Sequence, residues 1–372
     1  MRVLRILLAT EIGGDPNWIP QGIKPEQIAK EASKRGGVEC DGYDTPIKTI
    51  VHTAKHLEEE AENADFWIFH CMDMDDEHNL LPDGKWGKLR KPWSIWVWFC
   101  EEKDPYQLSY LMNMTMTMRL ESDIVMSYVN SDREMPDVLG EAWNEFGPTP
   151  MVPFEKRGSE NPVLWMAHNC QELDNKNGAS GNMLNNRTEY VRDLMEHVGV
   201  DSLGGCLNTK TDKKLSDRSQ GLMVSMGREA KYFGNKYKFY LSFENSNCRG
   251  YVSEKLPKAF IWNLVPIVGG PDDWKRFIPT ETSAISTEDF PTAQALGEFI
   301  KKVAANETLY NQYHSWRSNP NEITPEFRKN FPPQSTRDHD VCKFTDVWKW
   351  GKIGGKIAKP FEPCRLTQPG GI

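Results

Sequence analysis

Five polar or charged side chains that could bind an anion stand close together between residues 245 and 255. They are Asn245, Arg249, Tyr251, Glu254 and Lys255. Together they offer hydrogen-bonding groups, one carboxylate and two cations, a combination that suits a phosphate site. The alternative is a surface loop beside a salt-bridged helix end, and the spacing of the residues favours neither interpretation.

The patterns on either side of this polar loop predict a strand before it and a helix after it. Phe239, Leu241 and Phe243 alternate with less apolar residues, which is typical of a strand. Ser253 is expected to cap a helix whose first turn contains Pro257. Open α/β sheets bind ligands between the carboxyl end of a strand and the following helix, and the start of a helix favours anions. The expected elements are therefore compatible with an anion site.

A further cation stands at the expected start of a helix over residues 187–198. The apolar side of that helix consists of Tyr190, Val191, Leu194 and Val198. Arg187 then lies in the first turn, where a positive charge opposes the helix dipole. Because this placement is unfavourable for the helix, anion binding explains Arg187 better than helix stability does. A simple ion pair with Glu189 or Asp193 is the alternative.

Two adjacent carboxylates, Glu101 and Glu102, follow a strand pattern dense in aromatic residues at 94–100. A carboxylate at the end of a strand beside aromatic rings is placed to have a raised pKa and to act as a general base. From the residues alone, a surface pair of glutamates before a turn is the interpretation that we favour.

Patterns that could hold a metal ion are weak in this chain. Asp73-Met74-Asp75 resembles the Asp-x-Asp metal signature of one class of glycosyltransferases, but a solvated acidic loop explains it better. The eight cysteines are too dispersed for a zinc motif with paired Cys-x-x-Cys spacing. Their even number permits disulfides without requiring them. We therefore expect no metal site.

Length and charge favour a soluble enzyme of two domains. The chain has 372 residues, enough for two domains that each bury a core. Its formal net charge of −8, with no long basic run, argues against a nucleic-acid-binding groove. No window approaches the roughly 20 apolar residues of a membrane span, so no transmembrane segment is expected.

Strand patterns alternate with helix patterns along the chain, which predicts βαβ units and mostly parallel sheets. Helices are expected near 25–35 and 47–62, and the methionines of 113–118 are expected to fill core. Residues 132–160 are rich in proline, glycine and charge, which is typical of a linker. The expected units are 1–155 with the linker, 156–330, and a loosely structured tail over 331–372, whose packing against the first unit stays open.

The motifs of the second half closely resemble the signature of the α1,3/4-fucosyltransferase family. The matching strings include Phe243-Glu244-Asn245-Ser246, Tyr251-Val252-Ser253-Glu254-Lys255-Leu256 and Val265-Pro266-Ile267-Val268. Shorter matches follow the family order elsewhere, at 64–70, 96–101, 113–115, 122–124, 169–170, 186–187 and 200–204. The resemblance therefore extends over roughly residues 60 to 320.

This resemblance implies an α/β protein with the GT-B fold, in which two Rossmann-like domains face a cleft. Residues 1–155 would bind the acceptor and residues 156–330 the GDP-sugar. The implied reaction is the inverting transfer of L-fucose from GDP-fucose to a hydroxyl of an acceptor sugar, with O3 as the expected position. The implied partners are GDP-fucose and an oligosaccharide or glycoconjugate acceptor. No cofactor is required, and a divalent metal at most stimulates the reaction.

The family match also implies roles for single residues. Glu101 is the expected base, and Arg187 and Lys255 are expected to hold the pyrophosphate. The residues expected to contact ribose, phosphate or fucose are Asn245, Tyr251 and Glu254. The family commonly has Phe-Glu-Ser-Pro at the base, whereas here the string is Phe99-Cys100-Glu101-Glu102. Because this string is shifted by one position, Glu102 is the alternative base.

Two other functions stay open at this point: a GT-B transferase for another nucleotide sugar, and a catalytically silent relative that binds a sugar or nucleotide. Animal members of the family carry an N-terminal membrane anchor and a tight cluster of C-terminal cysteines. This chain shows no anchor, and its Cys342 and Cys364 are far apart. We therefore expect a soluble, cytoplasmic protein if this is the full native chain, and a Golgi-lumenal one if an anchor was removed.

Overall fold

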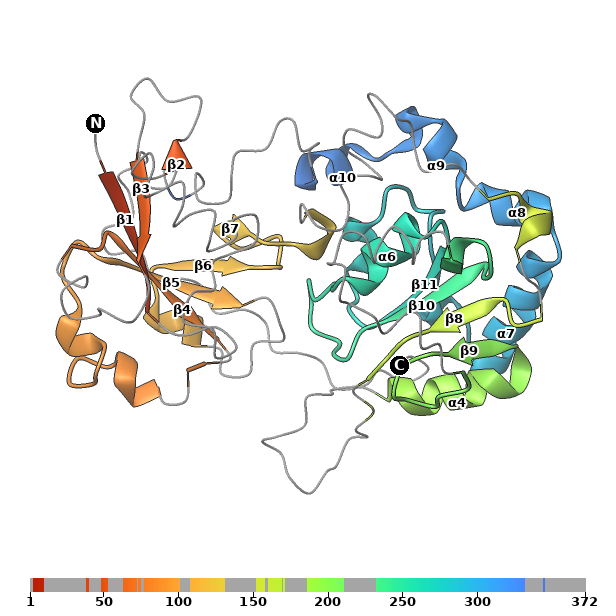
Figure 1. Cartoon of the computed structure of the whole chain (residues 1–372), viewed down its shortest axis with the longest axis horizontal. Coiled ribbons are helices and arrows are strands. Elements are labelled where there is room, and N and C mark those ends of the chain that lie inside the picture. Colours follow the sequence, from red (N-terminus) through yellow and green to blue (C-terminus); the bar gives the residue numbers. More distant parts are fainter. Residues whose placement is uncertain are drawn as a thin grey trace. The chain divides into compact units, whose positions relative to one another are not determined.

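The computed structural model divides into two compact units. Unit 1 comprises Met1–Ser127 with Thr336–Glu362, and unit 2 comprises Tyr128–Ser335 with Pro363–Ile372. The residues that the structure describes are 3–9, 38–39, 48–52, 63–71, 73–74, 77–100, 108–130, 152–157, 160–168, 170, 186–210, 232–331 and 344. Each unit is built on its own sheet (Figure 1). The boundaries expected at 155/156 and 330/331 stay a prediction.

The sheet of unit 1 has the strand order β2-β3-β1-β4-β5-β6-β7 within the described residues. Its strands are β1 (Val3–Leu8), β2 (Val38–Glu39), β3 (Lys48–His52), β4 (Phe66–His70), β5 (Ile95–Cys100), β6 (Met114–Thr117) and β7 (Ile124–Val125). Its short 3-10 helices are η2 (Glu77–Leu80), η3 (Gly87–Leu89) and η4 (Leu108–Leu111). All described pairs are parallel except β2 with β3. The carboxyl ends of β4 and β5 therefore lie at the same edge.

Aromatic side chains fill the core beside β4 and β5, and every residue of both strands is buried. The ring of Trp96 lies 6.0 Å from that of Trp67 and 4.8 Å from that of Phe69. A strand that is buried on both faces reads as a continuous apolar run, which explains why these strands were recognisable from the sequence. Phe344, from the expected tail, packs its ring 5.0 Å from that of Phe66.

The helix expected near 47–62 is wrong at residues 48–52, and residues 53–62 lie outside the described residues. Residues 48–52 of the stretch 47–62 form strand β3, which pairs with β1 from Val3↔Lys48 to Leu7↔His52. The run Ile47 to Val51 mixes β-branched residues with polar ones, so the sheet overrides the helical spacing. The expected helix at 25–35 lies outside the described residues. The methionines of 113–118 do fill core, as predicted, since Met114, Met116 and Met118 are at most 2% exposed.

The sheet of unit 2 has the order β12-β11-β10-β8-β9, and all of its described pairs are parallel. Its strands are β8 (Val163–Trp165), β9 (Val200–Ser202), β10 (Phe239–Phe243), β11 (Val265–Gly269) and β12 (Ile285–Ser286). The α-helices among its described residues are α4 (Arg187–His197), α6 (Lys255–Ile261), α7 (Ala293–Ala304), α8 (Glu307–Gln312), α9 (Ser315–Ser318) and α10 (Pro325–Asn330). The short 3-10 helices are η5 (Tyr128–Asn130), η7 (Phe154–Lys156), η8 (Trp274–Phe277), η9 (Thr287–Asp289) and η10 (Pro320–Glu322).

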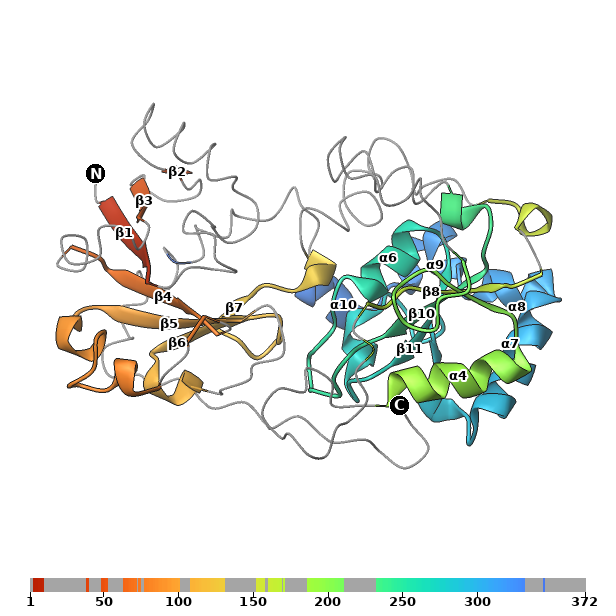
Figure 2. The same ribbon diagram turned by 60° about the horizontal axis from the view of Figure 1, so that its bottom comes forward.

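Helices cover both faces of this second sheet (Figures 1 and 2). Helices α4 and α7 pack together on the face that presents Phe239, Leu241 and Phe243 of β10. Helix α6 packs on the opposite face, where the ring of Trp262 lies 5.2 Å from that of Tyr240. The predicted helix from Arg187 and the predicted strand over 239–243 are confirmed. Strand β10 therefore ends in the middle of the sheet, with a helix layer on each side.

Each unit contains a disulfide within its described residues. Cys71 is bonded to Cys100 in unit 1, and Cys170 is bonded to Cys206 in unit 2. Cys248 is also disulfide-bonded. The even number of cysteines permitted these bonds, but nothing in the spacing identified the pairs. In the described part of the chain, no helix is long and apolar enough to cross a membrane.

Candidate functional site

The candidate site lies where β10 ends and the loop toward α6 begins. The first residue after the strand, Glu244, has a buried side chain that is 3% exposed. Its backbone N–H donates to the carbonyl of Gly269 at 3.0 Å, so the position continues the pairing with β11. Gly270 leaves room for it, because a Cβ there would lie 3.0 Å from Glu244 Cβ and the φ of +138° suits glycine.

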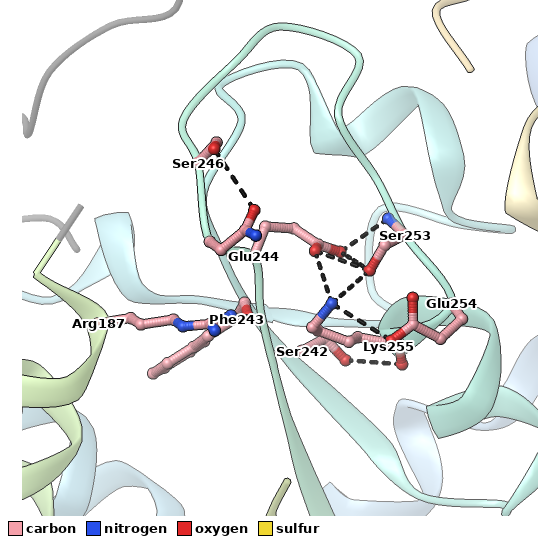
Figure 3. A network of polar contacts seen from close by, with 9 residues as sticks. Arg187, Ser242, Phe243, Glu244, Ser246, Ser253, Glu254 and Lys255 are labelled. Atoms are coloured by element: carbon pink, nitrogen blue, oxygen red, sulfur yellow. Dashed lines mark hydrogen bonds and ion pairs between the residues drawn. The ribbon is translucent and has the colours of Figure 1, made fainter. Parts of the chain in front are cut away.

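The Glu244 carboxylate binds the residues that open α6 (Figure 3). Its Oε1 accepts hydrogen bonds from the Ser253 N–H at 2.8 Å and from Ser253 Oγ at 3.0 Å. Its Oε2 accepts from Ser253 Oγ at 2.8 Å and from Lys255 Nζ at 3.1 Å. A buried carboxylate is costly unless it is paired and hydrogen-bonded, and Glu244 meets both conditions. The network fixes the end of β10 to the start of α6.

Lys255 is the cation at the centre of this network. Its Nζ donates to Ser253 Oγ at 2.6 Å and to Glu254 Oε1 at 3.3 Å, in addition to Glu244. Burial alone would lower the pKa of Lys255, but the carboxylates of Glu244 and Glu254 outweigh burial and raise it above its ordinary value. Burial likewise opposes ionisation of Glu254, while Lys255 and Lys258 lower its pKa. Lys255 and Glu254 are therefore both charged at neutral pH.

Arg187 is the second cation of the site. It is the first residue of α4 and is 2% exposed. Its Nη1 donates to the carbonyl of Phe243 at 2.8 Å, so the guanidinium lies beside the last residue of β10. Burial lowers the pKa of Arg187, and the nearby carboxylate of Glu244 is the largest contribution that opposes this shift. An arginine stays charged under such conditions, because its ordinary pKa is above 12.

Several contacts hold the loop over 245–251 in place. Asp273, 7% exposed, accepts a hydrogen bond of 2.7 Å from the Gly250 N–H and pairs with Arg249 at 3.9 Å. The N–H of Tyr251 donates to the carbonyl of Cys248 at 3.0 Å. Ser246 Oγ donates to Asn245 Oδ1 at 3.4 Å. This polar loop is therefore an ordered part of the site.

The structure brings together most of the residues that the sequence singled out. Arg187, Tyr251 and Glu254 lie close enough to interact electrostatically, and Lys255 belongs to the same group. Asn245 stands beside Glu244 at the start of the loop. Glu101 and Glu102 lie outside the described residues. Whether these side chains perform the implied roles stays a prediction.

Two site residues had other interpretations at the sequence level. Ser253 was expected to be the N-cap of the helix, but α6 begins at Lys255 with Glu254 as its N-cap, and the Ser253 hydroxyl binds Glu244 instead. In the sequence, Glu244 stands out only as part of the family-like string Phe243-Glu244-Asn245-Ser246. A carboxylate placed directly after a fully buried strand was the one signal that could have identified it. Pro257 lies in the first turn of α6, as predicted.

In unit 1, polar side chains lie at the carboxyl edge of the sheet, where β4 ends and where β5 ends just before Glu101. His70, 6% exposed at the end of β4, binds the carboxylate of Asp73 through Nδ1. His70 pairs with Phe99 of β5 in the parallel register, and the two rings lie 5.4 Å apart. Asp73, from the expected acidic loop, is therefore engaged by a histidine. Asp75 lies outside the described residues.

A group of three potential metal ligands lies on α4. Asp193, Glu196 and His197 offer ligand atoms within 4.8 Å of one another. The two carboxylates are exposed, whereas His197 is only partly exposed and packs against Gly297 of α7. Exposed groups of this kind are common without an ion, and nothing links this one to Glu244.

Family models match both halves of the chain. The model described as glycosyltransferase family 10 (fucosyltransferase), C-terminal part, matches residues 156–351, which is more than half of the chain. The chain belongs to glycosyltransferase family 10. A second model, described as the N-terminal part of fucosyltransferases, matches residues 18–129 of this family 10 chain. The predicted family is thus confirmed.

Curated relatives of this family 10 chain carry fucosyltransferase names. It is 35% identical over 136 residues to alpha-(1,3)-fucosyltransferase B of Drosophila melanogaster, which covers 37% of this chain and 30% of that protein. It is 27% identical over 267 residues to 4-galactosyl-N-acetylglucosaminide 3-alpha-L-fucosyltransferase 9 of Rattus norvegicus, covering 70% and 62%. The chain thus spans less than two thirds of the length of these relatives.

A solved structure supports the fold of the family 10 chain. A crystal structure of an alpha1,3-fucosyltransferase matches with a TM-score of 0.53 at 15% identity, covering 95% of this chain and 92% of that one. At this identity the match speaks for the fold alone. The predicted α/β class, with two Rossmann-like units of the GT-B type, is confirmed.

Proposed function

We propose that this protein transfers L-fucose from GDP-fucose to a hydroxyl of an acceptor sugar, with inversion at the anomeric carbon and with O3 as the expected position. The observation that carries the proposal is the pair of cations beside the end of β10 in a family 10 chain, the buried Arg187 and the partly buried Lys255 at the start of α6. The names of the curated relatives, which specify transfer to a 3-position, support it.

The two cations suit the leaving group of this reaction. As the bond between fucose and the diphosphate breaks, its electron pair passes to a phosphate oxygen, and negative charge grows there. Arg187 and Lys255 would stabilise this charge from fixed positions in a largely buried site. Removing Lys255 should cost roughly 2–4 kcal/mol of transition-state stabilisation, by analogy with the loss of an oxyanion donor. No step in this scheme is assigned to a metal.

The proposed base is Glu101, with Glu102 as the alternative. Its carboxylate would take the proton of the acceptor hydroxyl while the oxygen forms its bond to the anomeric carbon. β5 ends at Cys100, so Glu101 follows directly from the carboxyl edge of the unit 1 sheet. Catalytic groups at that edge are the usual arrangement in parallel α/β sheets.

The remaining site residues are proposed to contact the donor. Asn245 and Tyr251 belong to the ordered loop after β10, and they offer an amide and a hydroxyl to the ribose, a phosphate or fucose. Glu254 offers a carboxylate to hydroxyl groups. GDP-fucose and an oligosaccharide or glycoconjugate are the proposed substrates, and the scheme requires no cofactor.

We propose that the protein works in an oxidising compartment such as the Golgi lumen. The bonds Cys71–Cys100 and Cys170–Cys206 support this location, because disulfides persist in secretory compartments and are rare in the cytosol. The cytoplasmic alternative from the sequence has no comparable support.

An array of defined oligosaccharides tests the proposed function. The full chain is incubated with labelled GDP-fucose, and parallel reactions contain GDP-mannose or UDP-galactose. Fucose on acceptors that contain N-acetylglucosamine, with little transfer from the other donors, is the expected result. Transfer from GDP-mannose or UDP-galactose instead would show that another nucleotide sugar is the donor. Binding without transfer across the whole array would indicate a catalytically silent relative.

A further inference from the structure

Glu244 is a buried carboxylate at the candidate site that the proposed chemistry does not use. Ser253 and Lys255 donate four hydrogen bonds to its two oxygens. A neutral glutamine could keep the two bonds that Ser253 donates to Oε1, because an amide oxygen also accepts, but not the bond to Oε2. What it could not supply is the negative charge beside Lys255. The carboxylate form of Glu244 therefore matters to the lysine, with which it forms a direct ion pair, and its charge also acts on Arg187.

Lys255 needs such a partner if it is to act from a fixed position. A lysine side chain has a flexible stem and carries about 2 kcal/mol of rotamer entropy, so by itself it is a poorly placed charge. Its ammonium has three donors, and the three acceptors around it are Glu244, Ser253 and Glu254. Glu244 and Ser253 are both buried, and Glu244 fixes Ser253 as well.

We infer that Glu244 is a positioning residue, which holds the Lys255 ammonium through a direct ion pair and through Ser253 so that it can receive a phosphate oxygen of the donor. This inference rests on the proposed function and assigns the lysine's placement to one carboxylate. Glu254 is the exchangeable partner. Its side chain is 31% exposed and its bond of 3.3 Å is the longest of the three, so a phosphate oxygen would replace it first.

Glu244 also helps to keep Lys255 protonated. The charged groups that act on Lys255 are the carboxylates of Glu244 and Glu254, which raise its pKa, and the guanidinium of Arg187, which lowers it together with burial. Lys258 acts on this cluster of charges by lowering the pKa of Glu254. Loss of the Glu244 charge therefore moves the pKa of Lys255 downward, toward the neutral range.

Glu244→Gln is the variant that tests this inference, and Asp201→Asn is its matched control. Asp201 is also a buried carboxylate paired with a lysine, since Lys210 Nζ lies 2.5 Å from its Oδ2, but it is bound to Tyr237 and Asn161 rather than to the site. GDP affinity of the full chain is measured by calorimetry from about pH 7 to pH 10. Circular dichroism establishes that each variant is folded.

In Glu244→Gln we expect GDP affinity to fall about tenfold or more and to decline further with rising pH, whereas the wild type stays nearly flat. Asp201→Asn should keep the wild-type affinity and pH profile. A folded Glu244→Gln with unchanged affinity and profile would overturn the inference. Loss of affinity to the same degree in Asp201→Asn would do so too, because it would mean that general destabilisation explains the effect.

A double-mutant cycle separates positioning from general damage. If Glu244 acts through Lys255, the change Glu244→Gln should alter GDP affinity less than about twofold in a Lys255→Met background. A full additional loss in that background would contradict the inference.

A readout without nucleotide keeps this inference distinct from the proposed function. Competitive acetylation of Lys255, followed by mass spectrometry across pH, reports the pKa of its amine. Glu244→Gln should shift the labelling of Lys255 to lower pH and leave that of exposed Lys301 unchanged. Failure of the wild type to bind GDP would refute the proposed donor, whereas an unshifted Lys255 profile would refute the role of Glu244 whatever the nucleotide.

Discussion

Cys71 and Cys100 are joined by a disulfide across the carboxyl ends of two neighbouring parallel strands, with their Cα atoms 5.2 Å apart. The N–H of Cys71 also donates to the carbonyl of Phe99 at 2.9 Å, so the bond lies at the end of a regular ladder. Glu101, the proposed base, is the next residue in the chain. The bond therefore fixes the end of β5, directly before the proposed base in sequence.

Replacing both cysteines by alanine tests this relationship. The bond closes a sequence separation of 29 residues, and its loss should lower the free energy of unfolding by about 2–4 kcal/mol. We expect kcat to fall while GDP affinity stays near the wild-type value, because Arg187 and Lys255 belong to the other unit. Chemical denaturation and calorimetry measure the two effects. Equal losses in transfer and GDP binding would contradict a local role.

The base is tested by Glu101→Gln, with Glu102→Gln as the matched control. Glu101→Gln should reduce kcat by about 10² to 10⁴-fold and leave GDP affinity unchanged, because only proton transfer is removed. Glu102→Gln should retain most activity. Initial rates at saturating GDP-fucose make the comparison, and the reverse pattern would move the base to Glu102.

Two buried arginines of unit 2 are expected to have different roles, one in binding GDP and the other in stabilising the fold. Arg187 lies beside the proposed diphosphate site, whereas Arg157 donates to the carbonyls of Asn263 at 2.7 Å and Val152 at 3.2 Å. Arg187→Met should weaken GDP binding by about 10- to 100-fold, the loss of one charged hydrogen-bonding partner. Arg157→Met should lower the free energy of unfolding by about 1–3 kcal/mol, since it removes hydrogen bonds from a buried charged donor to these backbone carbonyls. Calorimetry and urea denaturation distinguish the two, and a swapped pattern would contradict the assignment.

The core elements of unit 2 were accessible from the sequence because their patterns are simple. Strand β10 shows apolar alternation, and α4 shows the expected stripe with Val191 and Leu194 fully buried. Arg187 and Lys255 could be singled out as candidate site residues, because both stand at the start of an expected helix, while their proposed roles came from the family resemblance.

Other features depend on contacts that periodicity does not encode. The stretch Lys48–His52 pairs with β1, more than 40 residues away in sequence, and this pairing overrides its helical spacing. Ser253 looked like a helix cap, but its hydroxyl bonds to a carboxylate nine residues earlier. The pairing of Cys71 with Cys100 likewise follows from the register of β4 and β5. Such contacts emerge only when the strands are placed side by side.

The stability of unit 2 should depend on pH through Asp201. Burial would raise the pKa of Asp201, but hydrogen bonds from Lys210, Tyr237 and Asn161 outweigh burial and lower it below its ordinary value. A carboxyl group whose pKa is lower in the folded state stabilises the fold above its unfolded pKa, near 3.9, and that contribution is lost as pH falls through the folded pKa. Asp201→Asn should therefore destabilise at pH 7 by about 1–3 kcal/mol, with a smaller difference near pH 3. Urea denaturation at both pH values measures this, and an equal difference at both would contradict it.

The central claim, an inverting transfer of fucose from GDP-fucose, is tested most directly by the anomeric configuration of the first product. Proton NMR of a reaction with the wild-type chain, GDP-fucose and a simple acceptor that contains N-acetylglucosamine resolves the new anomeric signal. The account predicts one fucoside whose configuration is opposite to that of the donor, with release of GDP, and no such signal in Glu101→Gln. A product that retains the donor configuration, or GDP-fucose left intact with every acceptor tried, would contradict it.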